Sequence, residues 1–229
     1  SEAERRLASP SGTVVLGEPG PRTPRHPSFA ADNHAAVFGG DRSFLKVAAD
    51  APRFAEFQFT AGDSITLEAW VKVQSLGEGQ LAYLVGQGRS LKFAGADKNQ
   101  NYALRLKGEG QQGLVSFLFA SQAEQGRSAD WHRWTSRSGF SLGGGWHHVA
   151  VSYTFGKPES IRGYVDGRVV EGKWDMGGAT TRPPVTDDDE LAVGTGNGNT
   201  AGNRFQGWLD EVRVWKRVVP DAELIARFQ

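Results

Sequence analysis

The sequence predicts an all-β fold in which two antiparallel sheets pack face to face, with one short helix at the C-terminus. Three observations lead to this prediction. Short apolar runs recur along most of the chain and are separated by Gly, Asp and Asn. Apolar and polar residues alternate from Ser64 to Val73, as expected of a strand that buries one face. Asp166-Gly167 separates two apolar runs and tolerates the positive φ angles of a tight hairpin turn.

The distribution of proline predicts where the domain begins. Five of the ten prolines lie within the first 27 residues, mixed with Gly, Ser and Arg, and this composition disfavours both helix and sheet pairing. We therefore expect residues 1–33 to be a linker, a disordered tail or an arm lying on the domain. Residues 34–229 are expected to form one β-sandwich domain, because single sandwiches commonly reach this size.

Charge and composition argue against two classes of partner. The 26 Lys and Arg residues are balanced by 26 Asp and Glu residues, so the basic footprint of a nucleic-acid-binding protein is missing. No run approaches the roughly 18 apolar residues of a membrane-spanning helix, so we expect no membrane insertion of this segment. The chain has no cysteine, which leaves no disulfide framework or thiolate metal site. It begins at Ser1, and we expect it to be part of a longer polypeptide with other domains.

The elements are expected in a regular order along the chain. The predicted strands cover residues 35–38, 44–47, 64–73, 81–86, 91–93, 102–106, 114–119, 146–153, 161–165, 168–171, 191–193 and 205–215. In the last of these the apolar positions change parity, which predicts burial of both faces or a bulge near Asp210-Glu211. Residues 220–228 have helical apolar spacing, and we expect this helix to cap an open end of the sandwich.

Several motifs occur in a defined order. They include Ala36-Val37-Phe38-Gly39-Gly40-Asp41, Ile65-Thr66-Leu67-Glu68-Ala69-Trp70-Val71, Gly145-Trp146-His147-His148-Val149-Ala150-Val151, Tyr164-Val165-Asp166-Gly167, Leu191-Ala192-Val193-Gly194 and Phe205-Gln206-Gly207-Trp208-Leu209-Asp210-Glu211-Val212-Arg213-Val214-Trp215. In this order they resemble the laminin-G-like and pentraxin-like branch of the concanavalin A-like lectin and glucanase superfamily. The resemblance covers the chain from Ala35 to its end. It implies a jelly-roll sandwich of two facing antiparallel sheets.

A second resemblance concerns cellular location. Residues 154–167, 173–179 and 187–191 are similar to versions of this domain embedded in large exported proteins of the planctomycete type. This resemblance implies a secreted, cell-envelope or periplasmic protein.

The spacing of Asp and Glu residues along the chain indicates whether it could be a hydrolase. Hydrolases of this superfamily carry Glu-x-Asp-x-x-Glu on one strand, and strand alternation can bring two carboxyls to the separation of about 5 Å that retaining glycosidases use. That motif does not occur, Glu68 has no acidic companion on its strand, and the acidic run 187–190 is typical of a solvated loop. We therefore expect no catalytic residues and no enzyme activity, and we keep a divergent glycoside hydrolase as an alternative.

The candidate ligand site is Trp131, His132, Arg133 and Trp134. These residues lie in a long polar region that shows no strand pattern. Indole faces stack on sugar rings, and a guanidinium supplies donors in a fixed geometry. The structural alternative is that both tryptophans fix a long loop onto the sandwich. His147 and His148 are adjacent on a strand and therefore face opposite sides, so we expect them to be structural.

The resemblance also implies a structural Ca²⁺ ion between an early strand and the last long strand. Asp210 stands at the position of the usual carboxylate ligand, and Gly39 and Asp41 would add main-chain oxygens. Such an ion would tie the two ends of the domain together. The alternative is an ion pair of Asp210 with Arg213 or Lys46.

Taken together, the sequence predicts a non-catalytic module that binds a glycan or a protein partner within a larger exported protein. Loops at residues 76–80, 97–101, 122–138 and 197–203 are further ligand candidates, because loops carry function on a rigid scaffold. The alternative from another class is a structural spacer between neighbouring domains.

Overall fold

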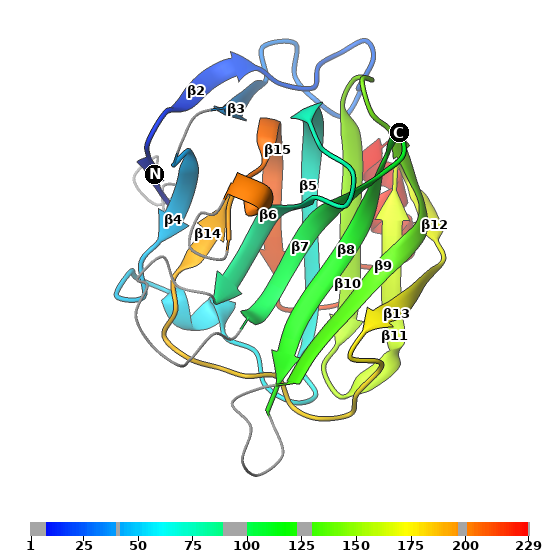
Figure 1. The fold of residues 1–229 in the computed structure, drawn as a ribbon. Helices are drawn as coiled ribbons and strands as arrows, with labels where there is room; N and C mark the ends of the chain where they lie inside the picture. The colour runs from blue at the N-terminus through cyan, green and yellow to red at the C-terminus, as the bar shows by residue number, and fades with distance from the viewer. Residues whose placement is uncertain (1–7, 40–41, 89–99, 123–129, 197–200, 229) are drawn as a thin grey trace.

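Two antiparallel sheets stack face to face, as predicted (Figure 1). The computed structural model describes residues 8–39, 42–88, 100–122, 130–196 and 201–228. Within these residues, one sheet has eight strands in the order β1 (Ser9–Ser11), β4 (Phe44–Val47), β14 (Leu191–Val193), β6 (Leu81–Gly88), β7 (Gln100–Glu109), β8 (Gln112–Ser121), β9 (Asp130–Ser141) and β13 (Gly172–Met176).

The second sheet has seven strands in the same described part of the chain. Their order is β12 (Arg168–Val170), β11 (Lys157–Val165), β10 (His147–Thr154), β5 (Ser64–Ser75), β15 (Gln206–Trp215), β3 (His34–Phe38) and β2 (Val14–Pro19). Short 3₁₀ turns, η2 (Phe54–Phe57) and η4 (Ala201–Asn203), and the helix α1 (Asp221–Phe228) complete the fold. No described helix has the length and apolar character needed to cross a bilayer.

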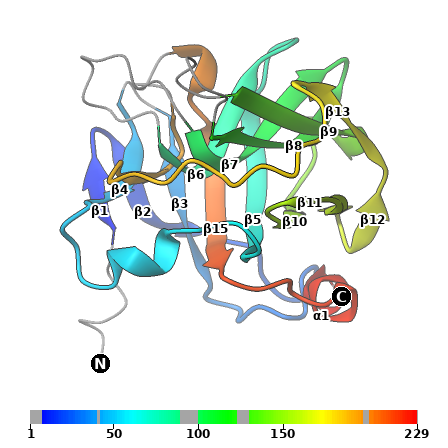
Figure 2. The same cartoon turned by 90° about the horizontal axis from the view of Figure 1, so that it is seen from below.

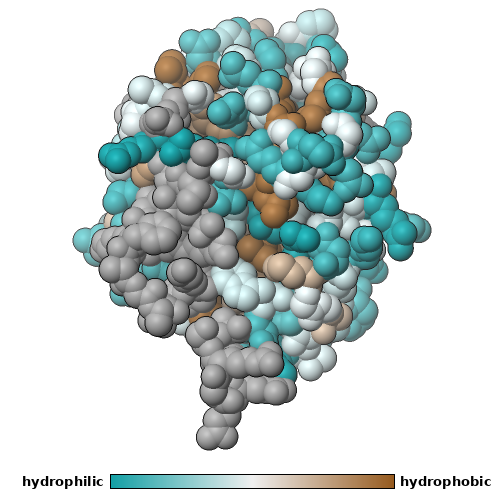
Figure 3. All heavy atoms as spheres, in the orientation of Figure 1, coloured by the Kyte–Doolittle hydropathy of each residue, from teal (hydrophilic) through white to brown (hydrophobic). Residues whose placement is uncertain are grey.

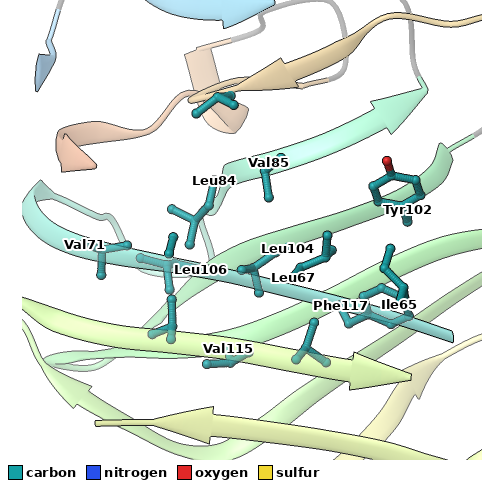
Figure 4. Packing of buried hydrophobic residues seen from close by; sticks show 14 of the residues in the cluster. Ile65, Leu67, Val71, Leu84, Val85, Tyr102, Leu104, Leu106, Val115 and Phe117 are labelled. Carbon is teal, nitrogen blue, oxygen red and sulfur yellow. The ribbon is translucent and has the colours of Figure 1, made fainter. Parts of the chain in front are cut away.

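The core lies between the sheets and follows the predicted alternation. Ile65 and Leu67 of β5 point inward and are fully buried, and they meet Leu104 of β7 and Phe117 of β8 from the facing sheet (Figure 4). Each such side chain contributes roughly 1.5–3 kcal/mol of hydrophobic free energy when it leaves water. The residues between them along each strand point away from this core, so their chemistry is not dictated by packing between the sheets.

Two local backbone features confirm predictions. Asp166 and Gly167 join β11 to β12 with φ angles of 50° and 69°, the positive values that a type I′ hairpin turn requires. On β15 the pairing with β5 slips between Asp210 and Arg213, and Glu211 adopts a φ of 48°. The predicted bulge is therefore present, and it turns the Asp210 carboxylate away from the regular ladder.

Four strands were not predicted from the sequence. β1 and β2 lie within residues 1–33 and pair with β4 and β3, so part of this segment lies on the sandwich edges. β9 lies where the sequence predicted a loop, so the placement of residues 130–138 in a loop is wrong, and β13 lies where no strand was predicted. Their inward positions carry His132, Trp134 and Trp174 rather than aliphatic residues, which hid the alternation. The strand predicted at residues 91–93 lies outside the described residues.

Helix α1 lies on the outer face of the seven-stranded sheet, which corrects the prediction that it caps an open end (Figure 2). Phe228 stacks on Trp70 of β5 with ring centroids 5.8 Å apart. His26 and Phe29 of the N-terminal segment contact the same indole at 5.0 and 5.1 Å. The two ends of the described chain thus meet over Trp70, which explains how an indole that points away from the main core is 2% exposed.

Glu68 lies beneath this covering layer as an ionised group with several donors. Its Oε2 accepts a hydrogen bond from His148 Nε2 at 3.0 Å. Its Oε1 accepts one from Trp215 Nε1 at 2.6 Å and one from Arg227 of α1. Burial alone would raise the pKa of Glu68, but the bonds from His148 and Trp215 and the charge of Arg227 together lower it. Glu68 therefore fixes the helix to the sheet.

We expect Glu68→Gln to lower the free energy of unfolding at pH 7 by about 2 kcal/mol, because the buried bonds from His148, Trp215 and Arg227 lose their ionised acceptor, while Arg227 keeps its bond to Glu223. The folded-state pKa of Glu68 lies below its ordinary value, so its contribution is present at neutral pH and is lost as the pH falls. Urea unfolding of both proteins should show a difference that narrows below about pH 4.

The exposed Glu159 of β11 provides the control, since Glu159→Gln makes the same chemical change at the surface. A loss of stability for Glu68→Gln that stayed the same at every pH would show that packing, and not charge, explains the role of Glu68.

Candidate functional site

The outer face of the eight-stranded sheet is the face on which β9 presents the predicted ligand residues. Trp131 and Arg133 point outward from β9, whereas His132 and Trp134 point into the core. Alternate residues on a strand share a face and adjacent residues face opposite sides, so the four side chains cannot converge on one ligand. The structure separates the predicted site into an outward pair and an inward pair.

The inward pair is structural. His132 is 5% exposed and stacks on Phe119, with ring centroids 5.1 Å apart. Its Nδ1 donates to the Gly178 carbonyl at 2.9 Å, and its Nε2 accepts from Ser121 Oγ at 3.0 Å. A histidine with both ring nitrogens bonded inside the core has no nitrogen left for a ligand or a metal.

Trp134 fills the space between the sheets at their β11 and β13 ends. It is 3% exposed, and its indole lies directly over Gly163 of β11 and Gly172 of β13. A Cβ atom at either glycine would collide with the ring. This fit explains why two strands that flank a tryptophan carry glycine, and it corrects the prediction that Trp134 contacts a ligand.

The outward pair stands over an apolar floor. Trp131 is half-buried and packs against a small cluster formed by Tyr83, Ala103 and Leu118 of β6, β7 and β8. Arg133 Nε donates to Asp175 Oδ1 of the neighbouring strand β13 at 2.6 Å. Because one edge of the guanidinium is held by this carboxylate, its plane is fixed and its other N–H groups point away from Asp175. A flat aromatic ring and an oriented donor therefore lie two residues apart on one strand.

A polar row crosses the same face at right angles to the strands. The strand registers place its members opposite one another on β6, β7, β8, β9 and β13; they are Tyr83, Arg105, Ser116, Thr135 and Lys173. Arg105 lies over the Tyr83 ring at 5.3 Å and donates to Ser116 Oγ at 3.1 Å. Thr135 Oγ1 is buried and has no hydrogen-bond partner among the described residues. Figure 3 views the molecule from this side, and on its coloured part several small hydrophobic groups lie among hydrophilic residues.

Sequence reasoning missed this row for an identifiable reason. The alternation along 102–106 and 114–119 already implied that Arg105 and Ser116 face away from the core. That they lie opposite each other, and opposite Thr135 and Lys173, depends on the register between strands, which the sequence does not state.

The predicted calcium ligands were tested against the residues present. Asp41 lies outside the described residues, and a Cβ atom at Gly39 would meet no other atom within 4 Å. Asp210 Oδ2 accepts a hydrogen bond from Asn33 Nδ2 at 2.6 Å, and Oδ1 accepts one from the Glu211 amide at 2.8 Å. In the described part of the chain no three His, Asp or Glu residues are grouped so that they could hold a metal. Two donors therefore face this carboxylate among the described residues, and because the predicted ligand Asp41 lies outside them, the calcium site stays a prediction.

The expected ion pairs of Asp210 are not formed in the described residues. Lys46 pairs instead with Glu190 at 3.1 Å, and Arg213 pairs with Glu211. Burial raises the pKa of Asp210, which the bond from Asn33 and the charge of Arg213 only partly offset.

Asn33 connects the N-terminal segment to β15. Its Nδ2 also donates to the Pro21 carbonyl at 3.1 Å, and its own carbonyl accepts from Gly20 N at 3.0 Å and from Arg22 Nε at 2.8 Å. One amide thus joins the segment around Pro21 to the carboxylate at the β15 bulge. A half-open cavity of about 380 Å³ adjoins Asp210; its other lining is mostly apolar, as with Phe38, Leu45 and Leu209, and it includes neither Trp131 nor Arg133.

We expect Asn33→Ala to lower the free energy of unfolding by about 1–3 kcal/mol, because Asp210 loses a donor in a half-buried place. Hydrogen exchange of residues 20–33 should accelerate in this variant and remain unchanged in the exposed control Gln112→Ala.

Thermal unfolding of the unmodified protein should be the same in 1 mM CaCl₂ and in EDTA. A melting temperature several degrees higher in calcium would contradict the amide interpretation and support the calcium prediction.

Comparisons with known proteins agree with this architecture. The family model described as the concanavalin A-like lectin/glucanases superfamily matches residues 47–225. No curated protein matches the chain.

Among solved structures, the chain is similar to the binding domain of Paraclostridial Mosquitocidal Protein 1, with a TM-score of 0.58 and 11% identity over 96% of this chain and 46% of that one. It is similar to the Ruminococcus gnavus IT-sialidase CBM40 bound to α2,3 sialyllactose, with a TM-score of 0.55 and 15% identity over 85% of this chain and 96% of that one. It is also similar to the botulinum neurotoxin serotype D/C binding domain, with a TM-score of 0.55 and 10% identity over 96% of this chain and 46% of that one. The chain spans about half of the two toxin domains. At sequence identities of 10–15%, these structural similarities show a common fold alone.

Proposed function

The chain belongs to the concanavalin A-like lectin/glucanases superfamily, and from this membership we propose that it is a non-catalytic carbohydrate-binding module whose site is the outer face of the eight-stranded sheet. The observation that carries the proposal is the placement of Trp131 and Arg133 two residues apart on β9, above an apolar floor. An aromatic ring provides area for a sugar face, and an oriented guanidinium provides donors for its hydroxyls.

The rigidity of this pair supports binding rather than packing alone. Both side chains project from a strand that is hydrogen-bonded on both sides, by β8 and by β13. The Arg133–Asp175 bond fixes the guanidinium before any ligand arrives. Preorganised groups lose little conformational freedom on binding, so more of the contact energy appears as affinity. The likeness to the sialidase module bound to sialyllactose is consistent with a glycan ligand.

The arrangement of acids supports a non-catalytic role. On the described outer face the acids include Asp175, which Arg133 engages, Glu109, which pairs with Lys107 at 2.6 Å, and Glu190, which pairs with Lys46 at 3.1 Å. Glu68 lies on the other sheet beneath α1, where His148, Trp215 and Arg227 bind it. Neither arrangement offers the free pair of carboxyls that glycoside hydrolysis uses. We further propose that the module is part of a larger exported protein, in which other domains would determine what the captured glycan is used for.

Trp131→Ala is expected to weaken glycan binding about tenfold, since truncating a stacked aromatic at a binding site commonly costs more than 1 kcal/mol. A glycan array would identify the ligand, and isothermal titration calorimetry would measure its dissociation constant. Trp208→Ala is the matched control, because Trp208 is a half-buried indole on the seven-stranded sheet, under Lys72 at 4.5 Å.

Two results would contradict the proposal. Failure of any glycan to bind would favour a structural spacer or a protein-binding module. Equal binding by the Trp131→Ala and Trp208→Ala variants would place the site on another surface.

A further inference from the structure

The outer face of the eight-stranded sheet carries an excess of positive charge that the whole chain does not have. Lys and Arg balance Asp and Glu at 26 each over the full sequence. Around the polar row the cations are Arg105, Lys107, Arg133 and Lys173, and the acids are Glu109 and Asp175, while at the β4 end of the same face Lys46 and Glu190 form one further pair. The excess is therefore local to the proposed binding face.

Within that set Lys173 is the exposed cation outside an ion pair, because Arg105 is 3% exposed and donates to Ser116. Lys107 is paired with Glu109 and Arg133 with Asp175, each at 2.6 Å. Lys173 is exposed on β13, and no described carboxylate lies within 4 Å of its ammonium, although its charge, after the bond from Lys107, helps to lower the pKa of Glu109. An unpaired lysine alone is common on protein surfaces, so a second observation is needed.

That second observation is the hydroxyl next to Lys173 in the row. Thr135 is paired directly with Lys173 across β9 and β13, and it is 3% exposed. Its Oγ1 has no hydrogen-bond partner in the described structure. Buried hydroxyls are normally bonded, so an unsatisfied one beside a free ammonium marks a place where an acceptor is missing. The hydroxyl is closed to solvent in this conformation, so a carboxylate reaches it only when the neighbouring side chains move, after which the ammonium and the hydroxyl can each donate to one of its oxygens.

The same strand connects this donor pair to the stacking residue. Trp131, Arg133 and Thr135 alternate along the outer face of β9, so the indole and the donor pair are separated by about 13 Å, four residues at roughly 3.3 Å each. A single sugar ring does not span that distance, whereas an oligosaccharide does. Arg133 lies midway, where it faces the ring that connects the two ends.

This inference rests on the proposed function and specifies its ligand. We infer that the glycan is acidic, with a carboxylate held by Lys173 and Thr135 while another ring of the same chain stacks on Trp131. Arg133 would then donate to hydroxyls between them.

The test compares acidic glycans with neutral counterparts that differ in the acidic group. An array would carry pectin and alginate oligosaccharides beside their carboxyl-reduced forms, and sialylated chains beside their desialylated forms. We expect binding to be confined to acidic members. For the best array ligand, calorimetry should show at least tenfold tighter binding of the acidic form, with an affinity that falls as NaCl rises from 50 to 500 mM.

Two variants identify the residues. Lys173→Gln should lower the affinity for the acidic form to that of its neutral counterpart, whereas Lys157→Gln should not change it, because Lys157 is exposed on β11 of the other sheet. Thr135→Val should weaken binding of the acidic form without lowering the melting temperature, since the hydroxyl it removes has no partner within the described protein.

The outcomes separate the two levels of the proposal. Equal binding of acidic and neutral forms, or an unchanged affinity in Lys173→Gln, would overturn the acidic inference and leave glycan binding intact. Absence of binding to every glycan, in a protein whose melting curve shows that it is folded, would overturn the proposed function itself.

Discussion

Burial between the two sheets is the constraint on which the rest of the structure depends. Every second residue of β5, β7 and β8 must fill that interface, and side chains such as Leu67, Leu104 and Phe117 do so completely. The intervening residues are then free of this requirement. Their chemistry differs between the two sheets, and this difference determines where a ligand can bind.

The seven-stranded sheet uses its outward residues to hold the ends of the chain. Trp70 and Glu68 receive the helix, and Trp70 also receives the segment that carries His26 and Phe29. That face is therefore a second, smaller core. On the eight-stranded sheet the outward residues Arg133 and Lys173 are polar and reach solvent, whereas Arg105 and Thr135 beside them are 3% exposed. One face therefore closes the fold, and the other combines a small buried cluster with a polar part around Arg133 and Lys173.

Features that depend on neighbouring residues could be predicted from the sequence. The turn at Asp166-Gly167, the alternation along β5 and the bulge at Asp210 each follow from a few consecutive residues, and the structure contains all three. The family resemblance supplied the stacking of the two sheets, which no local pattern could give.

Features that depend on strand pairing could not be predicted in the same way. The region around Trp131 was assigned to a loop because its inward residues, His132 and Trp134, are not aliphatic. The row from Arg105 to Lys173 exists only through the registers of β7, β8, β9 and β13. The partner of Asp210, Asn33, is 177 residues away, and nothing near Asp210 in the sequence indicates it. Local sequence therefore described the strands but not which residues meet across them.

Trp134 and the two glycines beneath it have an evolutionary consequence. The indole lies between the sheets, against Gly163 on one and Gly172 on the other, so it acts as a spacer whose thickness those glycines accommodate. A larger residue at either glycine is tolerable only with a smaller ring at position 134. A smaller ring there leaves a void unless one of the glycines is replaced by a larger residue. Across descendants of this sequence, these three positions should be inherited or replaced together.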